Sequence, residues 1–186
     1  KQILMKKLIV IGALIAATSA MADSVTGEYQ AVDVKGAANQ SLFLLGYKHE
    51  INKNLAADIS MSNTVTEGTN AVGARYEAGA TGTYDLVGPV KFYTRAALGE
   101  KTVGGKQFTY YSVEPGIQFP IVGALSGKVG WRWRSATDTA LGDQTHTTRV
   151  GVNYALTKTD SIGVRYDYMR GDFNQNAVAV NYTRSF

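Results

Sequence analysis

Two histidines and one neighbouring acid are the residues of this sequence that come closest to a catalytic set. His49 stands between Lys48 and Glu50, and His146 follows Asp143 by three positions. In a β-strand, residues three apart point to opposite faces, so alternation separates Asp143 from His146 instead of pairing them for acid–base chemistry. The sequence has no cysteine, only two histidines and no clustered carboxylates, which argues against a metal site. We therefore expect no catalytic residue, no metal and no cofactor.

Many of the charged residues fall on one face of segments whose other face is apolar. Large apolar side chains occupy every second position from Ile162 to Tyr168, and Arg165 and Asp167 lie between them. A strict period of two is the pattern of a β-strand, and no segment shows a convincing helical period. The same alternation runs through residues 55–62, 125–134 and 149–156. A β-sheet must therefore position these charged residues.

The connections between these segments are of two kinds, which alternate along the chain. Short turns lie at 52–54, 87–89, 121–123 and 157–160, and longer polar stretches lie at 35–40, 66–72, 100–106, 136–144 and 170–175. This layout predicts an all-β fold, a closed antiparallel up-and-down barrel of ten strands with both chain ends at the turn end. Eight strands is the alternative. The segment Glu114-Pro115-Gly116 predicts a bulge or kink in the sixth strand.

The first 22 residues have the organisation of a cleaved secretory signal. Lys6 and Lys7 precede an apolar run at 8–17, and the small residues of a cleavage site follow at 20–22. The apolar run is about ten residues long, against the roughly 20 that a membrane-spanning helix needs. We expect residues 1–4 to be an upstream overhang, the whole segment 1–22 to be removed, and residues 23–186 to form a single barrel domain.

Alternation alone fits a soluble barrel as well as a membrane barrel, but two further features favour the membrane. The polar face is rich in small residues, such as Ala177, Ala179 and Thr183, which suit a confined interior and would cover a soluble surface poorly. Aromatic residues collect toward the strand ends, as they do at the two interfaces of a membrane barrel. The residues expected in these aromatic girdles are Tyr47, Tyr84, Phe119, Trp131, Trp133, Tyr154, Tyr166, Tyr168 and Tyr182.

The last expected strand carries a third feature. Val178, Val180, Tyr182 and Phe186 share one face of it, and this pattern resembles the C-terminal signal by which outer-membrane barrels are recognised for assembly. Arg184 departs from the pattern, so its side chain must extend to the interface. The whole expected domain resembles the small Gram-negative porin-like and OmpA-like outer-membrane barrels. The resemblance implies a place in the outer membrane, contact with its lipid, and recognition of Phe186 by the barrel assembly machinery.

In this register the polar face lines the lumen of the barrel. The residues expected there are Lys48, Arg75, Glu77, Lys91, Arg95, Glu114, Lys128, Arg132, Arg134, Arg149, Arg165 and Asp167. Enclosed charges need partners, because removing an unpaired ion from water is costly. We therefore expect a paired network that holds the wall in register, with a surplus of bases that favours anions in any remaining pore. Arg132 and Arg134 are expected at the loop-side mouth.

Two functions remain open for such a barrel: a narrow porin-like channel for small solutes, or a structural or surface barrel. Ten strands should leave a narrow path or none. The alternative is an outer-membrane barrel enzyme of the omptin or lipid A-modifying kind, whose activity would depend on His146. Without Lys1, Lys6 and Lys7 the formal net charge falls from +4 to +1, so a nucleic-acid partner is not expected.

Overall fold

The structure is a computed structural model that describes residues 23–69, 72–103, 106–138 and 143–186. The expected signal peptide, residues 1–22, lies outside the described residues. All the regular secondary structure of the described part is β-strand. Within that part, no helix is long and apolar enough to cross a membrane.

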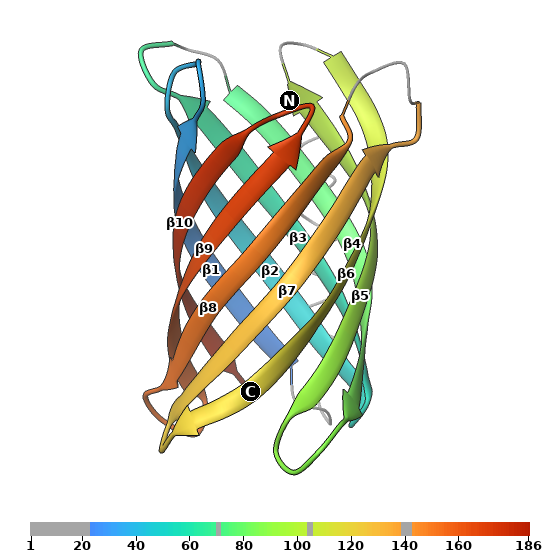
Figure 1. The fold of residues 1–186 in the computed structure, drawn as a ribbon, viewed down its shortest axis with the longest axis vertical. Coiled ribbons are helices and arrows are strands. Elements are labelled where there is room, and N and C mark those ends of the chain that lie inside the picture. Colours follow the sequence, from blue (N-terminus) through green and yellow to red (C-terminus); the bar gives the residue numbers. More distant parts are fainter. Residues whose placement is uncertain (1–22, 70–71, 104–105, 139–142) are drawn as a thin grey trace.

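Ten antiparallel strands form one closed barrel, in which β1 pairs with β10 (Figure 1). The strands are β1 (Asp23–Val34), β2 (Gln40–Asn52), β3 (Leu55–Thr66), β4 (Val72–Asp85), β5 (Lys91–Val103), β6 (Lys106–Val122), β7 (Leu125–Ala136), β8 (Thr145–Ala155), β9 (Asp160–Gly171) and β10 (Gln175–Ser185). The ten-stranded barrel is thus confirmed, and the eight-stranded alternative is wrong. Closure gives every strand two partners, so the sheet has no free edge.

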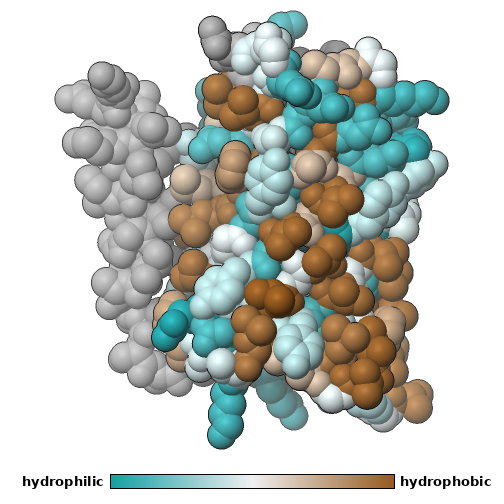
Figure 2. All heavy atoms as spheres, turned by 90° about the vertical axis from the view of Figure 1, so that its left-hand side faces the viewer, coloured by the Kyte–Doolittle hydropathy of each residue, from teal (hydrophilic) through white to brown (hydrophobic). Residues whose placement is uncertain are grey.

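The barrel is apolar outside and charged inside. On β9, the side chains of Ile162, Val164 and Tyr166 are 44–49% exposed, whereas Asp167 is buried. Figure 2 shows apolar side chains spread over the middle and lower outer surface, with hydrophilic ones gathered toward the upper end. A soluble barrel turns its large apolar side chains inward, so this arrangement is that of a transmembrane β-barrel.

The two ends of the barrel carry different connections. Asp23 and Phe186 both lie at the turn end, where the Phe186 amide donates a hydrogen bond of 2.9 Å to the Asp23 carbonyl oxygen. Two of the loop-end connections are shorter than expected, because the strands continue into them: residues 100–103 belong to β5 and residues 170–171 to β9. As a result, Lys101 is part of the barrel wall and not of a loop.

Pro115 does not interrupt β6. The strand runs unbroken over Lys106–Val122, and its pairing with β7 keeps the same register on both sides of Pro115. The bulge predicted at 114–116 is therefore wrong, and the register shift between β6 and β7 lies instead between Pro120 and Val122. Proline lacks an amide hydrogen and so forfeits one ladder hydrogen bond, but its fixed φ is compatible with an extended strand.

Candidate functional site

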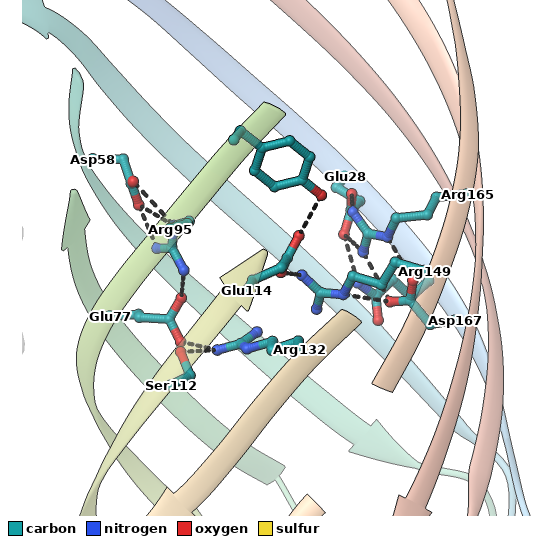
Figure 3. A network of polar contacts seen from close by, with 12 residues as sticks. Glu28, Asp58, Glu77, Arg95, Ser112, Glu114, Arg132, Arg149, Arg165 and Asp167 are labelled. Carbon is teal, nitrogen blue, oxygen red and sulfur yellow. Dashed lines mark hydrogen bonds and ion pairs between the residues drawn. The ribbon is translucent and has the colours of Figure 1, made fainter. Parts of the chain in front are cut away.

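Ion pairs cross the lumen in a layer that we call the charged belt (Figure 3). The belt consists of Glu28, Asp58, Glu77, Arg95, Glu114, Arg132, Arg149, Arg165 and Asp167. Every strand except β2 and β10 contributes to it. Glu77 of β4 binds Arg132 of β7, although β5 and β6 lie between them in the sheet. Strands that are not neighbours in the sheet can bring their side chains together only through the barrel interior, so these side chains point into the lumen.

Glu77 is the centre of the first half of the belt. Its carboxylate accepts a hydrogen bond of 2.6 Å from Arg95 Nη1, one from Arg132 Nη2, and one of 2.7 Å from the Tyr110 hydroxyl. Arg95 also donates to Asp58, with 3.0 Å between Nε and Oδ1. Glu77 is only 8% exposed, so these three donors replace the water that a carboxylate otherwise binds.

The second half of the belt runs from Glu114 to Glu28. Arg149 donates from Nη1 to Glu114 Oε2 at 2.5 Å, and its Nε lies 3.7 Å from Asp167 Oδ2. Arg165 donates from Nε to Asp167 Oδ1 at 2.7 Å and from Nη1 to Glu28 Oε2 at 2.9 Å. Each guanidinium thus bridges two carboxylates. The planar fork of five donors makes arginine suited to this role, which a single ammonium group would fill poorly.

A glycine leaves the space through which Arg95 crosses a neighbouring strand. Arg95 lies on β5 and Asp58 on β3, and the intervening β4 presents Gly79 between them. A Cβ atom at residue 79 would lie 2.8 Å from Arg95 Nη2. The absence of a side chain at Gly79 therefore permits the Arg95–Asp58 contact.

Two tyrosines in the lumen were missed at the sequence level. The Tyr93 hydroxyl donates a hydrogen bond of 3.1 Å to Glu114 Oε1, and Tyr110 donates to Glu77. The Tyr93 ring lies against Gly130, where a Cβ atom would be 2.3 Å from the hydroxyl oxygen. A glycine on the inward face of a strand was the available signal, because it often marks a place where a neighbour approaches closely.

A cavity lies on each side of the belt. The turn-side cavity has a volume of about 680 Å³ and the loop-side cavity about 440 Å³. Arg75, Arg132 and Arg149 line both cavities. One layer of side chains therefore separates them, and the constriction of the lumen consists of side chains rather than backbone.

Three of the residues expected in the lumen lie toward the turn end. Lys128 lines the turn-side cavity, and its ammonium lies 4.1 Å from the centre of the Tyr93 ring. Lys48 pairs with Glu50 at 3.1 Å, and both side chains are exposed. Lys91 is the first residue of β5, at the turn-side rim. None of the three belongs to the belt.

The two arginines expected at the loop-side mouth lie at different places. Arg134 binds Asp143 at 2.8 Å, and Lys101 approaches the same carboxylate oxygen at 3.6 Å. Arg132 belongs to the belt, where it is 5% exposed. Arg75 faces the loop-side cavity from β4. The expectation that Arg132 occupies the hydrated mouth is wrong, because its guanidinium extends to Glu77 inside the barrel.

The residues expected in the aromatic girdles lie on the outer face, with one difference. The most exposed of them are Tyr84, Trp131, Tyr154, Tyr166, Tyr168 and Tyr182. Trp133 packs edge-on against Tyr111, with 5.1 Å between ring centres, and Phe119 covers Gly127. Tyr47 shares the outward face of β2 with Phe43 and Leu45 but is buried there, and its hydroxyl donates a hydrogen bond of 2.8 Å to the Asp23 carboxylate.

The structure separates His146 from Asp143. The His146 ring stacks on Trp131, an outward-facing residue, with ring centres 5.4 Å apart. Asp143 lines the loop-side cavity and binds Arg134 inside the barrel. The two groups thus lie on opposite sides of the wall, as their spacing predicted. At the other end of the barrel, His49 binds the Asp23 carboxylate at 2.6 Å.

Comparison of the sequence with protein-family models and with curated proteins finds no match. Solved structures match in fold. The β domain of the Bordetella autotransporter BrkA aligns with a TM-score of 0.60 and 12% identity, over 90% of this chain and 100% of that one. The KdgM porin, solved in complex with disordered oligogalacturonate, aligns at 0.53 and 12%, over 88% and 99% of the two chains, and the NanC porin at 0.50 and 11%, over 88% and 100%. The chain therefore has the fold of the small outer-membrane β-barrels.

Proposed function

We propose that the chain is an integral protein of the bacterial outer membrane whose lumen is a narrow channel for small solutes. The barrel fold and the apolar outer face support the membrane setting. The observation that carries the channel is that Arg75, Arg132 and Arg149 line both cavities. A barrier one layer of side chains thick needs only a change of arginine rotamers to let a small ion through.

The lumen of this channel favours anions. Arg75, Lys101 and Lys128 all face the cavities, and among the described residues only Lys101 of these three forms an ion pair. The remaining positive charge raises the local concentration of anions in a narrow, low-dielectric passage. The field reaches across the lumen, since the Debye length is about 8 Å at physiological salt.

Single-channel recording in a planar bilayer tests the proposal. The wild-type barrel should show a small conductance, and its reversal potential in a KCl gradient should indicate chloride preference. The double variant Glu114→Ala/Arg149→Ala removes both members of one belt pair and so leaves neither charge buried alone. Its conductance should rise several-fold, because the constriction loses two long side chains.

A matched control removes an ion pair outside the lumen. Arg184 lies 3.7 Å from Asp160 on the outer face near the turn end. Asp160→Ala/Arg184→Ala has the same zero change in net charge and should leave conductance unchanged. The proposal fails if neither the wild type nor the belt variant conducts, or if the control variant raises conductance as much as the belt variant.

A structural or surface barrel is the second candidate, favoured by the completeness of the belt. Each belt carboxylate forms a hydrogen bond or an ion pair with at least one arginine of another strand. A network of that kind holds strands at fixed separations across the lumen. In this case the belt double variant should lose stability and gain no conductance.

We further propose that the barrel is not an enzyme. The positions of His146 outside the wall and Asp143 inside it support this, because a general base must lie within hydrogen-bond reach of the group it serves. Peptide or lipid A hydrolysis by the purified barrel that disappears in His146→Ala would refute it. Export through a cleaved signal at 1–22, insertion by the barrel assembly machinery and contact with outer-membrane lipid complete the proposal.

A further inference from the structure

The loop-side cavity has the size and lining of a small-molecule site. Its volume of about 440 Å³ lies in the range of pockets that hold small ligands. One part of its wall is cationic, with Arg75, Lys101 and Arg134. Another part is apolar, and includes the buried side chains of Val32 and Leu42. A wall divided in this way suits an amphipathic ligand.

The cationic part of the wall lacks enough negative charge. Arg75 and Lys101 are directly opposite each other on β4 and β5, a pairing of like charges that destabilises a sheet. One oxygen of Asp143 serves both Lys101, at 3.6 Å, and Arg134, at 2.8 Å. Arg75 interacts electrostatically with the Glu77 carboxylate, but among the described residues no hydrogen bond or ion pair within 4 Å holds its guanidinium. A bound anion would relieve this excess of positive charge.

The residues around this cavity also carry six buried polar atoms that form no hydrogen bond with the described residues. They are Ser62 Oγ, Arg132 Nε, Arg134 Nε, Asp143 Oδ2, Thr145 Oγ1 and Arg149 Nε. The residues that carry them all line the loop-side cavity. Each of these atoms is itself enclosed by protein, so they make the surroundings of the cavity polar without contacting its contents.

Two phenylalanines supply an aromatic surface beside the cations. The Lys101 ammonium lies 5.7 Å from the centre of the Phe108 ring and 5.2 Å from that of Phe173. Both rings line the cavity. A flat apolar group whose anionic end is held near Lys101 would therefore meet these rings.

We propose that the loop-side cavity binds a small monocarboxylate with an aromatic or other compact apolar body. The carboxylate lies between Arg75 and Lys101, and the apolar body lies against Phe108, Phe173 and Leu42. The site stands whether or not the barrel conducts ions, since it is confined to one side of the belt.

Calorimetric titration of the detergent-solubilised protein tests the proposal with benzoate as the probe. Benzamide has the same shape without the charge, and inorganic phosphate has charge without an apolar body. Benzoate should bind at least tenfold more tightly than either. Lys101→Met should weaken benzoate binding at least tenfold, whereas Lys158→Met, the same change in an exposed turn at the other end, should leave it unaltered. Phe173→Ala should weaken benzoate binding and leave the weak binding of phosphate as it is.

Three results would overturn the proposal. Equal affinity for benzamide removes the carboxylate from the interaction, and equal affinity for phosphate removes the apolar body. An equal loss of affinity in Lys101→Met and Lys158→Met places the binding elsewhere. If a variant fails to fold, methyl resonances of Val32, Leu42 and Thr145 in the wild type decide the question, because benzoate must shift them more than benzamide does. Unshifted methyl resonances at saturating benzoate also exclude the site.

Discussion

Arg165 on β9 binds the Glu28 carboxylate on β1 across the whole width of β10. Two hydrogen bonds of 2.9 and 3.0 Å join them, although the two residues are 137 positions apart in the chain. Ala179 is paired with Arg165 in the β9–β10 ladder and with Gln30 in the β1–β10 ladder, and it is completely buried. The Arg165–Glu28 pair thus links β1 to β9 on the inner side of the barrel. It crosses over Ala179, whose small side chain leaves room for it.

Enlarging that residue should destabilise the barrel. Ala179→Leu places a branched side chain where the Arg165 guanidinium crosses, and overpacking of this kind costs about 1–3 kcal/mol. Urea unfolding in lipid vesicles, followed by tryptophan fluorescence, measures the change. Val178→Leu is the control, because Val178 is 49% exposed on the outer face of the same strand. Equal unfolding free energies for the two variants would argue against the Arg165 path.

The Tyr93 hydroxyl should be responsible for the intolerance of Gly130 to substitution. A Cβ atom at residue 130 would lie 2.3 Å from the hydroxyl oxygen of Tyr93. The nearest carbon of the Tyr93 ring, Cζ, would be 3.4 Å away. Gly130→Ala should therefore lower the unfolding free energy by about 1–3 kcal/mol. Gly130→Ala combined with Tyr93→Phe should lose less than the sum of the two single variants. Strict additivity in this double-mutant cycle would show that the two groups do not compete for space.

The order of short turns and longer connections was enough to predict a closed barrel of ten strands, and alternation along single strands was enough to predict the inward face of the charged strands. Pairs such as Arg165 with Asp167 and apolar neighbours such as Val164 define a face without any knowledge of the other strands. The depth of a side chain along the barrel axis cannot be predicted from a single strand. It depends on strand tilt and stagger, which are properties of the closed sheet. For this reason Arg132 was expected at the mouth although it lies in the belt.

Adjacent aromatic residues hid part of the site from sequence analysis. Phe92 and Tyr93 are neighbours, as are Tyr110 and Tyr111, so each pair has one ring outside and one inside. Aromatic residues near strand ends indicate girdles, and nothing in the local pattern identifies which ring of a pair enters the lumen. Lys101 was missed for another reason, since polar residues near a turn indicate a loop even where β5 continues through them.

Closure of β1 on β10 predicts heat-modifiable migration in SDS gels. An unheated sample of the folded barrel should migrate differently from a boiled one, because a closed sheet has every backbone ladder satisfied and resists opening by detergent. Val178→Pro removes a ladder amide near the middle of β10 and should abolish the folded band, whereas Val178→Ala should keep it. Identical mobility before and after boiling, with a protein that stays soluble without detergent, would contradict a membrane barrel.

An arginine introduced at one or the other of two neighbouring residues tests which face of β10 points outward. Val180 is 52% exposed on the outer face near the middle of the strand, and Asn181 lines the turn-side cavity. Val180→Arg places a guanidinium in lipid, which costs about 2–4 kcal/mol at the bilayer midplane and less toward the interface. Asn181→Arg adds the same charge to a cavity of about 680 Å³ that also contains the Glu28 carboxylate, its partner in the β1–β10 ladder. The second variant should therefore fold nearly as well as the wild type. Folding yield in lipid vesicles, read from the unheated gel band, distinguishes the two. If Val180→Arg folded normally and Asn181→Arg did not, the outer and inner faces of the barrel would be exchanged.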